Sequence, residues 1–281
     1  MTEEILYKNR SSIACLSDAL KLMNNNVMTI IRRCWPYMLA TIILSAITTT
    51  VTLNTIINGA VIVNGICVGV LSIVTIIPLG MLIGRVISML SECTFRDATR
   101  RSVIVLLLVV GFAVIIGLAY VGIGYCAGVL AMKYTTVLKY LNTIIIILIA
   151  LLTVAGIVAA IPFVYFSMKY IHGKTTLKNI WKDYRTGMHY FFYILGTVAL
   201  TTFICLIIGF VFNIPITILT RAAVASSAST LIGDISDLPE NFPVLVFAAA
   251  LLASIAATLL LIWETLVARY IYGTTEKRLE G

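Results

Sequence analysis

Six long stretches of apolar residues constrain the fold of this chain more than any other feature of its sequence. They cover residues 37–57, 60–83, 103–126, 143–166, 191–213 and 244–266. A helix needs roughly 20 apolar residues to cross a bilayer core about 30 Å thick, and each stretch reaches that length. Only 11% of the residues are charged, whereas about 25% are charged in a soluble domain. We therefore expect an all-α, polytopic membrane bundle with six transmembrane helices.

The remaining residues are too few for a second, soluble domain, so we expect one integral membrane domain over residues 1–281. Its predicted parts are an amphipathic helix over 12–34, the six-helix bundle over 37–266, an extracytoplasmic loop over 214–243 and a tail over 269–281. The polar N-terminus and the length of the first apolar run predict no cleavable signal. The six cysteines form no Cys-x-x-Cys pair, and we interpret them as small apolar residues.

The basic residues predict the orientation. Seventeen of the 20 Lys and Arg residues precede span 1, follow span 6, or lie between spans 2 and 3 or spans 4 and 5; the others are Lys133, Lys139 and Arg221. Because Lys and Arg accumulate in short cytoplasmic loops, we expect both termini in the cytoplasm, and we expect the membrane to be a bacterial cytoplasmic (inner) membrane. Anionic lipid headgroups are then the expected partners of the net charge of +8, without nucleic acid.

A five-residue motif recurs at the end of two apolar runs, as KYIHG at 169–173 and RYIYG at 269–273. Together with a proline seven residues before a basic residue in spans 2 and 4, it suggests three parallel helical hairpins near 12–90, 93–173 and 175–273. Chance similarity between apolar sequences is the alternative, and both remain open. In either case we expect each glycine to end a helix, and His172 and Tyr272 to be interfacial rings.

The segment before span 1 has the periodicity of an amphipathic helix. Apolar residues recur every three or four positions, at Ile13, Leu16, Leu20, Met23, Val27, Ile30 and Cys34, and polar residues lie opposite. We expect this helix to lie on the cytoplasmic membrane face or to pack on the bundle, with Trp35 at the headgroup level. A shorter segment with Trp181 and Tyr184 on one face precedes span 5. Both are interpreted as interfacial anchors, with a docking surface for a partner helix as the alternative.

Ionisable residues are almost absent from the spans. Glu264 is the only acid within one, near the predicted cytoplasmic end of span 6. It lies about one helical turn from Arg269, and we expect Arg85 and Lys169 at a similar depth. A structural ion pair is the favoured interpretation of Glu264, and cation or proton coupling is the alternative.

Prolines and glycines within the spans carry the remaining signals. Pro78 and Pro162 are expected to kink spans 2 and 4, and these kinks either line a cavity or shape the bundle. Three Gly-x-x-x-Gly pairs favour close helix packing, most simply within the chain. Homo-oligomer contact and a loosely packed, moving helix are the alternatives. The pairs are Gly65 with Gly69, Gly80 with Gly84, and Gly124 with Gly128.

The sequence contains little that resembles a catalytic or cofactor site. Two histidines, His172 and His189, are too few for a histidine-rich iron site, and no metalloprotease, nucleophile-elbow or Walker motif is present. We therefore expect no enzyme, no cofactor and no metal site.

The entry segment ACLSDALKLMNNNVMTIIRRCWPYML at 14–39, followed by six spans, resembles bacterial integral membrane proteins related to the membrane domain of glycerophosphoryl diester phosphodiesterases. This resemblance covers most of the chain in architecture and has no diagnostic motif. It implies no catalytic residues, because the phosphodiesterase chemistry of that family belongs to a separate soluble domain.

Two function classes remain. The preferred one is a non-catalytic scaffold or accessory subunit of a membrane complex, with a protein partner or a second copy of the chain. The alternative is a permease or lipid-handling protein with a cavity between hairpins near Pro78, Pro162 and Glu264. A membrane enzyme is third, and its only candidate residues would be His172, His189 and Glu264.

Overall fold

The computed structural model describes residues 6–58, 61–133, 138–232 and 238–280. It is all-helical over these residues, with six helices long and apolar enough to span a membrane, which confirms the predicted fold class. The helices are α1 (Ser12–Asn58), α2 (Val61–Ser88), α3 (Phe95–Lys133), α4 (Leu138–Ile171), α5 (Ile180–His189), α6 (Phe191–Ile232) and α7 (Phe242–Glu280).

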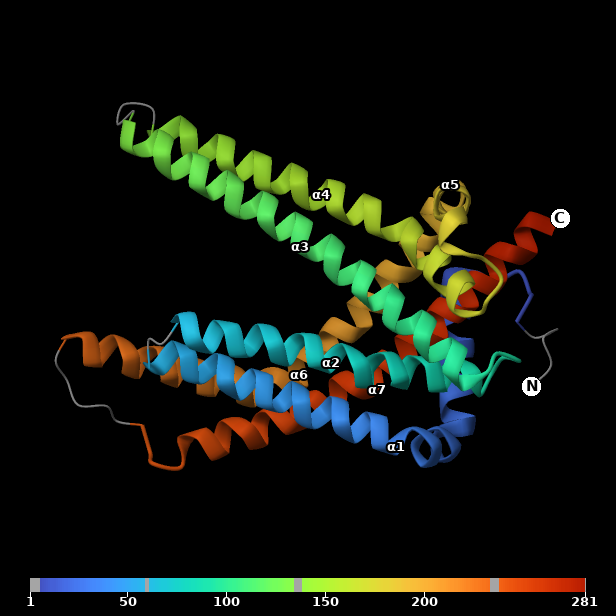
Figure 1. Ribbon diagram of the computed structural model, residues 1–281, viewed down its shortest axis with the longest axis horizontal. Helices are drawn as coiled ribbons and strands as arrows, with labels where there is room; N and C mark the ends of the chain where they lie inside the picture. The colour runs from blue at the N-terminus through green and yellow to red at the C-terminus, as the bar shows by residue number, and fades with distance from the viewer. Residues whose placement is uncertain (1–5, 59–60, 134–137, 233–237, 281) are drawn as a thin grey trace.

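The spanning helices form two groups. Helices α1, α2, α6 and α7 pack together and are called the four-helix group, whereas α3 and α4 form a hairpin that diverges from it (Figure 1). Both chain ends, α5 and the connection between α2 and α3 lie at the same end of the molecule, at the right in Figure 1. We call this the basic end, because Lys and Arg are concentrated in these segments.

The α3–α4 hairpin is attached mainly at the basic end. A Cβ atom at Gly84 of α2 would lie 2.6 Å from Thr99 Cα of α3, and one at Gly80 would lie 2.4 Å from a Val103 methyl. The predicted packing role of this glycine pair is therefore confirmed. At Gly65, Gly69 and Gly124, by contrast, a Cβ would meet nothing within 4 Å, so the predicted packing role within the chain is wrong for these three. The surroundings of Gly128 lie outside the described part.

Helix α1 joins the predicted amphipathic helix and span 1 into one element that contains Pro36. Its dark-blue first part crosses the end of the bundle, and the rest runs along it (Figure 1). Of the predicted apolar stripe, Leu16, Ile30 and Cys34 are buried, whereas Ile13 and Leu20 are 73% and 57% exposed. Cys15, Ala19 and Leu22 are buried as well, and α1 as a whole packs against α2, α6 and α7.

Two predicted boundaries also differ. Helix α6 continues through Pro215 to Ile232, so much of the predicted loop at 214–243 is helix, as Ala-rich and Ser-containing sequence allows. Helix α7 likewise continues to Glu280, through part of the predicted tail.

The two copies of the repeated motif, at 169–173 and 269–273, lie in different local structures, because α4 ends at Ile171 whereas α7 continues to Glu280. Gly173 follows the end of α4 with a φ of +77°, which favours glycine. Gly273 lies inside α7, so its predicted role as a helix stop is wrong. A Cβ at Gly273 would lie 2.5 Å from the Leu6 carbonyl oxygen, so this glycine instead admits the N-terminal segment against α7.

Candidate functional site

A polar network at the basic end links α4, α5 and α7. Lys169 Nζ lies 3.2 Å from Asp183 Oδ1 and 3.0 Å from Glu276 Oε1. The Tyr165 hydroxyl donates to Glu276 Oε1 at 2.5 Å and accepts from Lys169 Nζ at 3.0 Å. Thr175 donates to Asp183 Oδ2 at 2.5 Å. One cation is thus shared by two carboxylates from different helices, which fixes the end of α4 against α5 and α7.

The two rings of the repeated motif contact each other. His172 stacks on Tyr272 with 5.3 Å between ring centroids and 17° between planes. Burial, and then the positive charges of Arg269 and Lys174, lower the pKa of His172 to about 3. His172 is therefore neutral at physiological pH, and a group with so low a pKa is a weak general base there. This pair packs at the basic end rather than presenting a reactive imidazole.

Glu264 and Arg269 do not pair. Among the residues that the structure describes, Glu264 forms no salt bridge. The predicted ion pair is therefore wrong. Arg269 is buried and donates to the Leu90 carbonyl at the end of α2, and Lys169 uses Glu276 and Asp183 instead.

The two prolines lie in different surroundings. Pro162 contacts α5, because a Cβ at Gly187 would lie 2.7 Å from the Pro162 carbonyl oxygen. Pro78 lies in α2, next to Leu79, which lines a groove among α1, α2, α6 and α7. Neither proline nor Glu264 lines this groove or either of two other pockets found in the described part of the chain, so these three residues do not share the cavity considered from the sequence.

That groove has a volume of about 380 Å³ and contains several polar side chains. Thr41 and Thr258 donate their hydroxyl hydrogens to carbonyls of their own helices, at 2.8 Å and 2.7 Å, and the Asn213 amide does the same at 2.7 Å. The hydroxyl donors of Thr41 and Thr258 are therefore used within their helices, whereas Asn213 keeps a second amide N–H. The groove thus offers acceptor oxygens and an amide donor.

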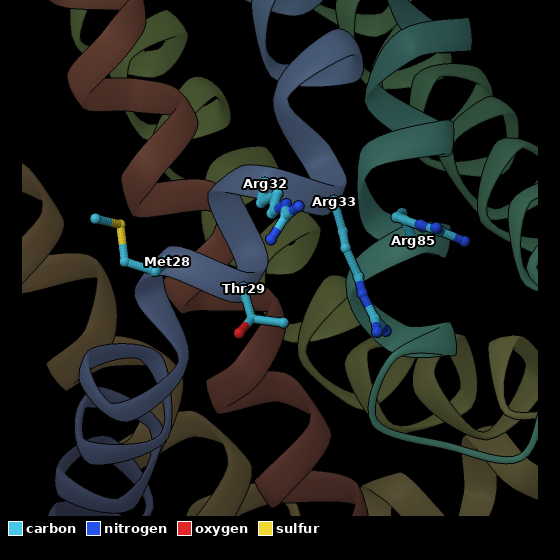
Figure 2. A pocket seen from close by; sticks show the side chains of 5 residues that line it. All are labelled: Met28, Thr29, Arg32, Arg33 and Arg85. Carbon is cyan, nitrogen blue, oxygen red and sulfur yellow. The ribbon is translucent and has the colours of Figure 1, made fainter.

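A second pocket lies where α1 turns, beside the end of α2, and we call it the arginine pocket (Figure 2). It has a volume of about 600 Å³ and is lined by Met28, Thr29, Arg32, Arg33 and Arg85. In Figure 2, Arg33 extends toward the end of α2, from which Arg85 projects. No ion pair of these three arginines is found within the described ranges. Trp35 follows on α1 and is 58% exposed.

The short helix α5 is oriented with a carboxylate inward. Asp183 and Gly187 are buried, whereas Trp181 and Met188 are 78% and 43% exposed, as is Leu177, at 43%, in the short 3-10 turn before α5. Trp181 packs edge-on against Tyr184, with 5.7 Å between the ring centroids. An outward apolar face beside lysines is the pattern of a segment at the membrane interface.

Within the described part of the chain, no group of three or more His, Cys, Asp or Glu side chains is placed to hold a metal ion. Sequence reasoning missed Glu276 and Asp183 as partners of Lys169. Glu276 was missed because α7 was expected to end at Gly273. Asp183 gave a signal, as a lone acid on the basic segment at 174–185.

No family model, curated protein or solved structure matches this chain.

Proposed function

We propose that this integral membrane protein is a non-catalytic scaffold or accessory subunit, and that its α3–α4 hairpin holds a partner within the membrane. The supporting observation is how little of this hairpin is packed. Only 11% of the most apolar segment of α3 and 6% of that of α4 are buried within the protein, compared with 17% in α1 and α6, 22% in α2 and 39% in α7. A lone pair of spanning helices offers two long faces to another membrane helix.

The glycines of α3 favour a protein partner. A Cβ atom added to any of four glycines of α3 would meet nothing within 4 Å; these are Gly111, Gly117, Gly122 and Gly124. Small residues are nevertheless where membrane helices approach each other closely. A second membrane helix could therefore approach this part of α3 with no steric conflict. The partner is either another membrane protein or a second copy of this chain.

Site-specific photo-cross-linking in native membranes tests this proposal. A benzoylphenylalanine at Leu118 of α3 or Ile146 of α4, which are 66% and 67% exposed, should give a discrete protein adduct. The same residue at Phe210 of α6, which is 73% exposed, serves as the control and should give lipid adducts only. A Gly117→Leu substitution should weaken the adduct from Leu118. Equal adducts at all three positions, or lipid adducts alone, would count against the scaffold.

A second candidate, a permease or lipid-handling protein, rests on the polar groove among α1, α2, α6 and α7. Replacing Ala253, which lines it, by Cys in a cysteine-free background gives a probe. Rapid reaction with a membrane-impermeant thiol reagent would favour a water-filled path. No reaction, together with cross-linking through α3, would favour the scaffold.

We further propose that the basic end lies in the cytoplasm, because Lys and Arg concentrate on that side of membrane proteins. A bacterial inner membrane is proposed from the resemblance of the entry segment to bacterial membrane proteins. A cysteine at the exposed Lys178 should react with an impermeant reagent only after the cells are opened. Labelling of intact cells would reverse the orientation.

A further inference from the structure

We propose that the arginine pocket binds the phosphate of an anionic membrane lipid. This inference stands apart from the scaffold function, since the pocket lies on α1 and α2 rather than on the α3–α4 hairpin. The proposed binding site is the turn of α1, and the proposed ligand group is a lipid phosphate.

The charges in the pocket call for an anion. Three arginines line it, and the structure pairs none of them with a described carboxylate. Their side chains extend in different directions (Figure 2), so they surround the pocket rather than form one cluster. Arg85 Nε is in addition buried without a hydrogen-bond partner. Three like charges around one pocket give it a positive potential that attracts an anion. A phosphate offsets this charge, because its oxygens accept paired N–H bonds from arginine.

Aromatic residues hold one of these arginines in place. The guanidinium carbon of Arg85 lies 5.0 Å from the centre of the Phe95 ring. Phe95 in turn packs on Tyr37, with 5.6 Å between the ring centroids. Cation–π contact and this ring pair restrict the side chain of Arg85 before any ligand arrives, and this lowers the entropy lost on binding.

The surroundings favour a lipid over free phosphate. Apolar side chains stand exposed around the pocket, with Met28 at 78%, Ile31 at 40% and Trp35 at 58%. The pocket also lies where the apolar part of α1 begins, which is the depth of headgroups and of interfacial tryptophans. A ligand with an anionic head and apolar tails meets both the arginines and this apolar rim.

Tryptophan quenching measures this binding. The chain has three tryptophans, and Trp181→Phe with Trp263→Phe leaves Trp35 as the only one. This protein is placed in a series of phosphatidylcholine nanodiscs that contain increasing fractions of phosphatidylglycerol, or of phosphatidylcholine, brominated near the top of its chains. We expect the brominated phosphatidylglycerol to quench Trp35 at a concentration at least about fivefold lower than the brominated phosphatidylcholine.

Charge-matched variants separate a site from general attraction. Replacing Arg32, Arg33 and Arg85 by Gln should abolish the preference for phosphatidylglycerol. Replacing the exposed Lys21, Lys178 and Lys182 by Gln removes the same charge and should preserve it. The double variant Arg32→Gln/Arg33→Gln changes only exposed side chains, so it should fold normally and still lose at least half of the preference.

Three results would overturn the proposal. These are equal quenching by the two lipids in the parent protein, an equal loss in the lysine control, and an unchanged preference in the arginine variants. A further arm adds inorganic phosphate at constant ionic strength. Loss of the preference at millimolar phosphate would mean that a soluble anion, and not a lipid, is the ligand.

Discussion

The four-helix group and the α3–α4 hairpin have similarly apolar helices but differ in how they are packed. In α7, buried residues extend from Phe242 to Thr275, and its contacts include α1, α2, α4 and α6. In α3, side chains beyond Leu106 are mostly exposed. Apolarity therefore places a helix in the membrane without saying what it touches, since lipid satisfies apolar side chains as well as protein does. Contacts depend instead on small residues and on polar groups at the helix ends.

The largest expected effect comes from separating the two regions. Gly80→Leu with Gly84→Leu forces side chains into the α3 backbone and should lower the free energy of unfolding by about 3 kcal/mol or more. The measurement is denaturant or SDS unfolding in detergent, followed by tryptophan fluorescence. The matched control is Gly111→Leu with Gly117→Leu, where a Cβ meets nothing within 4 Å. A similar loss in that control would mean that the hairpin is not open along α3.

A second substitution acts on the polar network at the hairpin's attachment. Lys169→Met leaves Glu276 and Asp183 without their shared cation and should cost about 2 to 3 kcal/mol, below the value for a fully buried pair because the lysine side chain is 20% exposed. Lys277→Met breaks an exposed pair, at 49% and 62% exposure, and should cost less than about 1 kcal/mol. The same unfolding experiment compares them, and equal losses would contradict a structural role for the network.

Lowering the pH should reduce the free energy of unfolding through His172, at the basic end. Its folded pKa of about 3 lies below the unfolded value of about 6.5, so as the pH falls the unfolded chain takes up this proton first. The contribution is fully present above pH 6.5 and is lost as the pH falls toward 3. Between pH 7.5 and pH 5 we expect a loss of about 2 kcal/mol.

The variant His172→Tyr should remove this part of the pH dependence while leaving function and stability at pH 7.5 nearly intact, because Tyr272 fills the equivalent position in the second motif. Unfolding curves at both pH values test this. An unchanged slope would show that other groups cause the acid sensitivity, and a loss of function with normal folding would restore His172 as a functional residue.

The smallest effect is expected on the hairpin itself. Leu118→Ala, at a side chain that is 66% exposed, should change the stability of the purified protein by less than about 0.5 kcal/mol. Leu82→Ala, at a side chain with no exposed surface, should cost about 2 to 5 kcal/mol. If the two losses were similar, the outer part of α3 would have to pack within the chain.

Sequence alone was enough for the spans and for the end that carries the termini, because length and hydropathy reflect the thickness of a bilayer directly. It was not enough to predict which side chains contact each other within the chain. Leu20 and Leu16 are the same residue type on one helix, yet they are 57% and 8% exposed, since only contact with α6 and α7 decides which side is covered. Lys169 was expected at the depth of Glu264, whereas its carboxylate partner Glu276 could be found only with a helix that passes through Gly273.

Because the α3–α4 hairpin is attached mainly at one end, a small tilt at that end displaces its other end by a much larger distance. Helix α3 has 39 residues, which at about 1.5 Å per residue makes it roughly 58 Å long. A tilt of about 10° at its base would displace the far end by roughly 10 Å on that length. The shared cation at Lys169 lies at the attached end of the hairpin, where it joins α4 to α5 and α7.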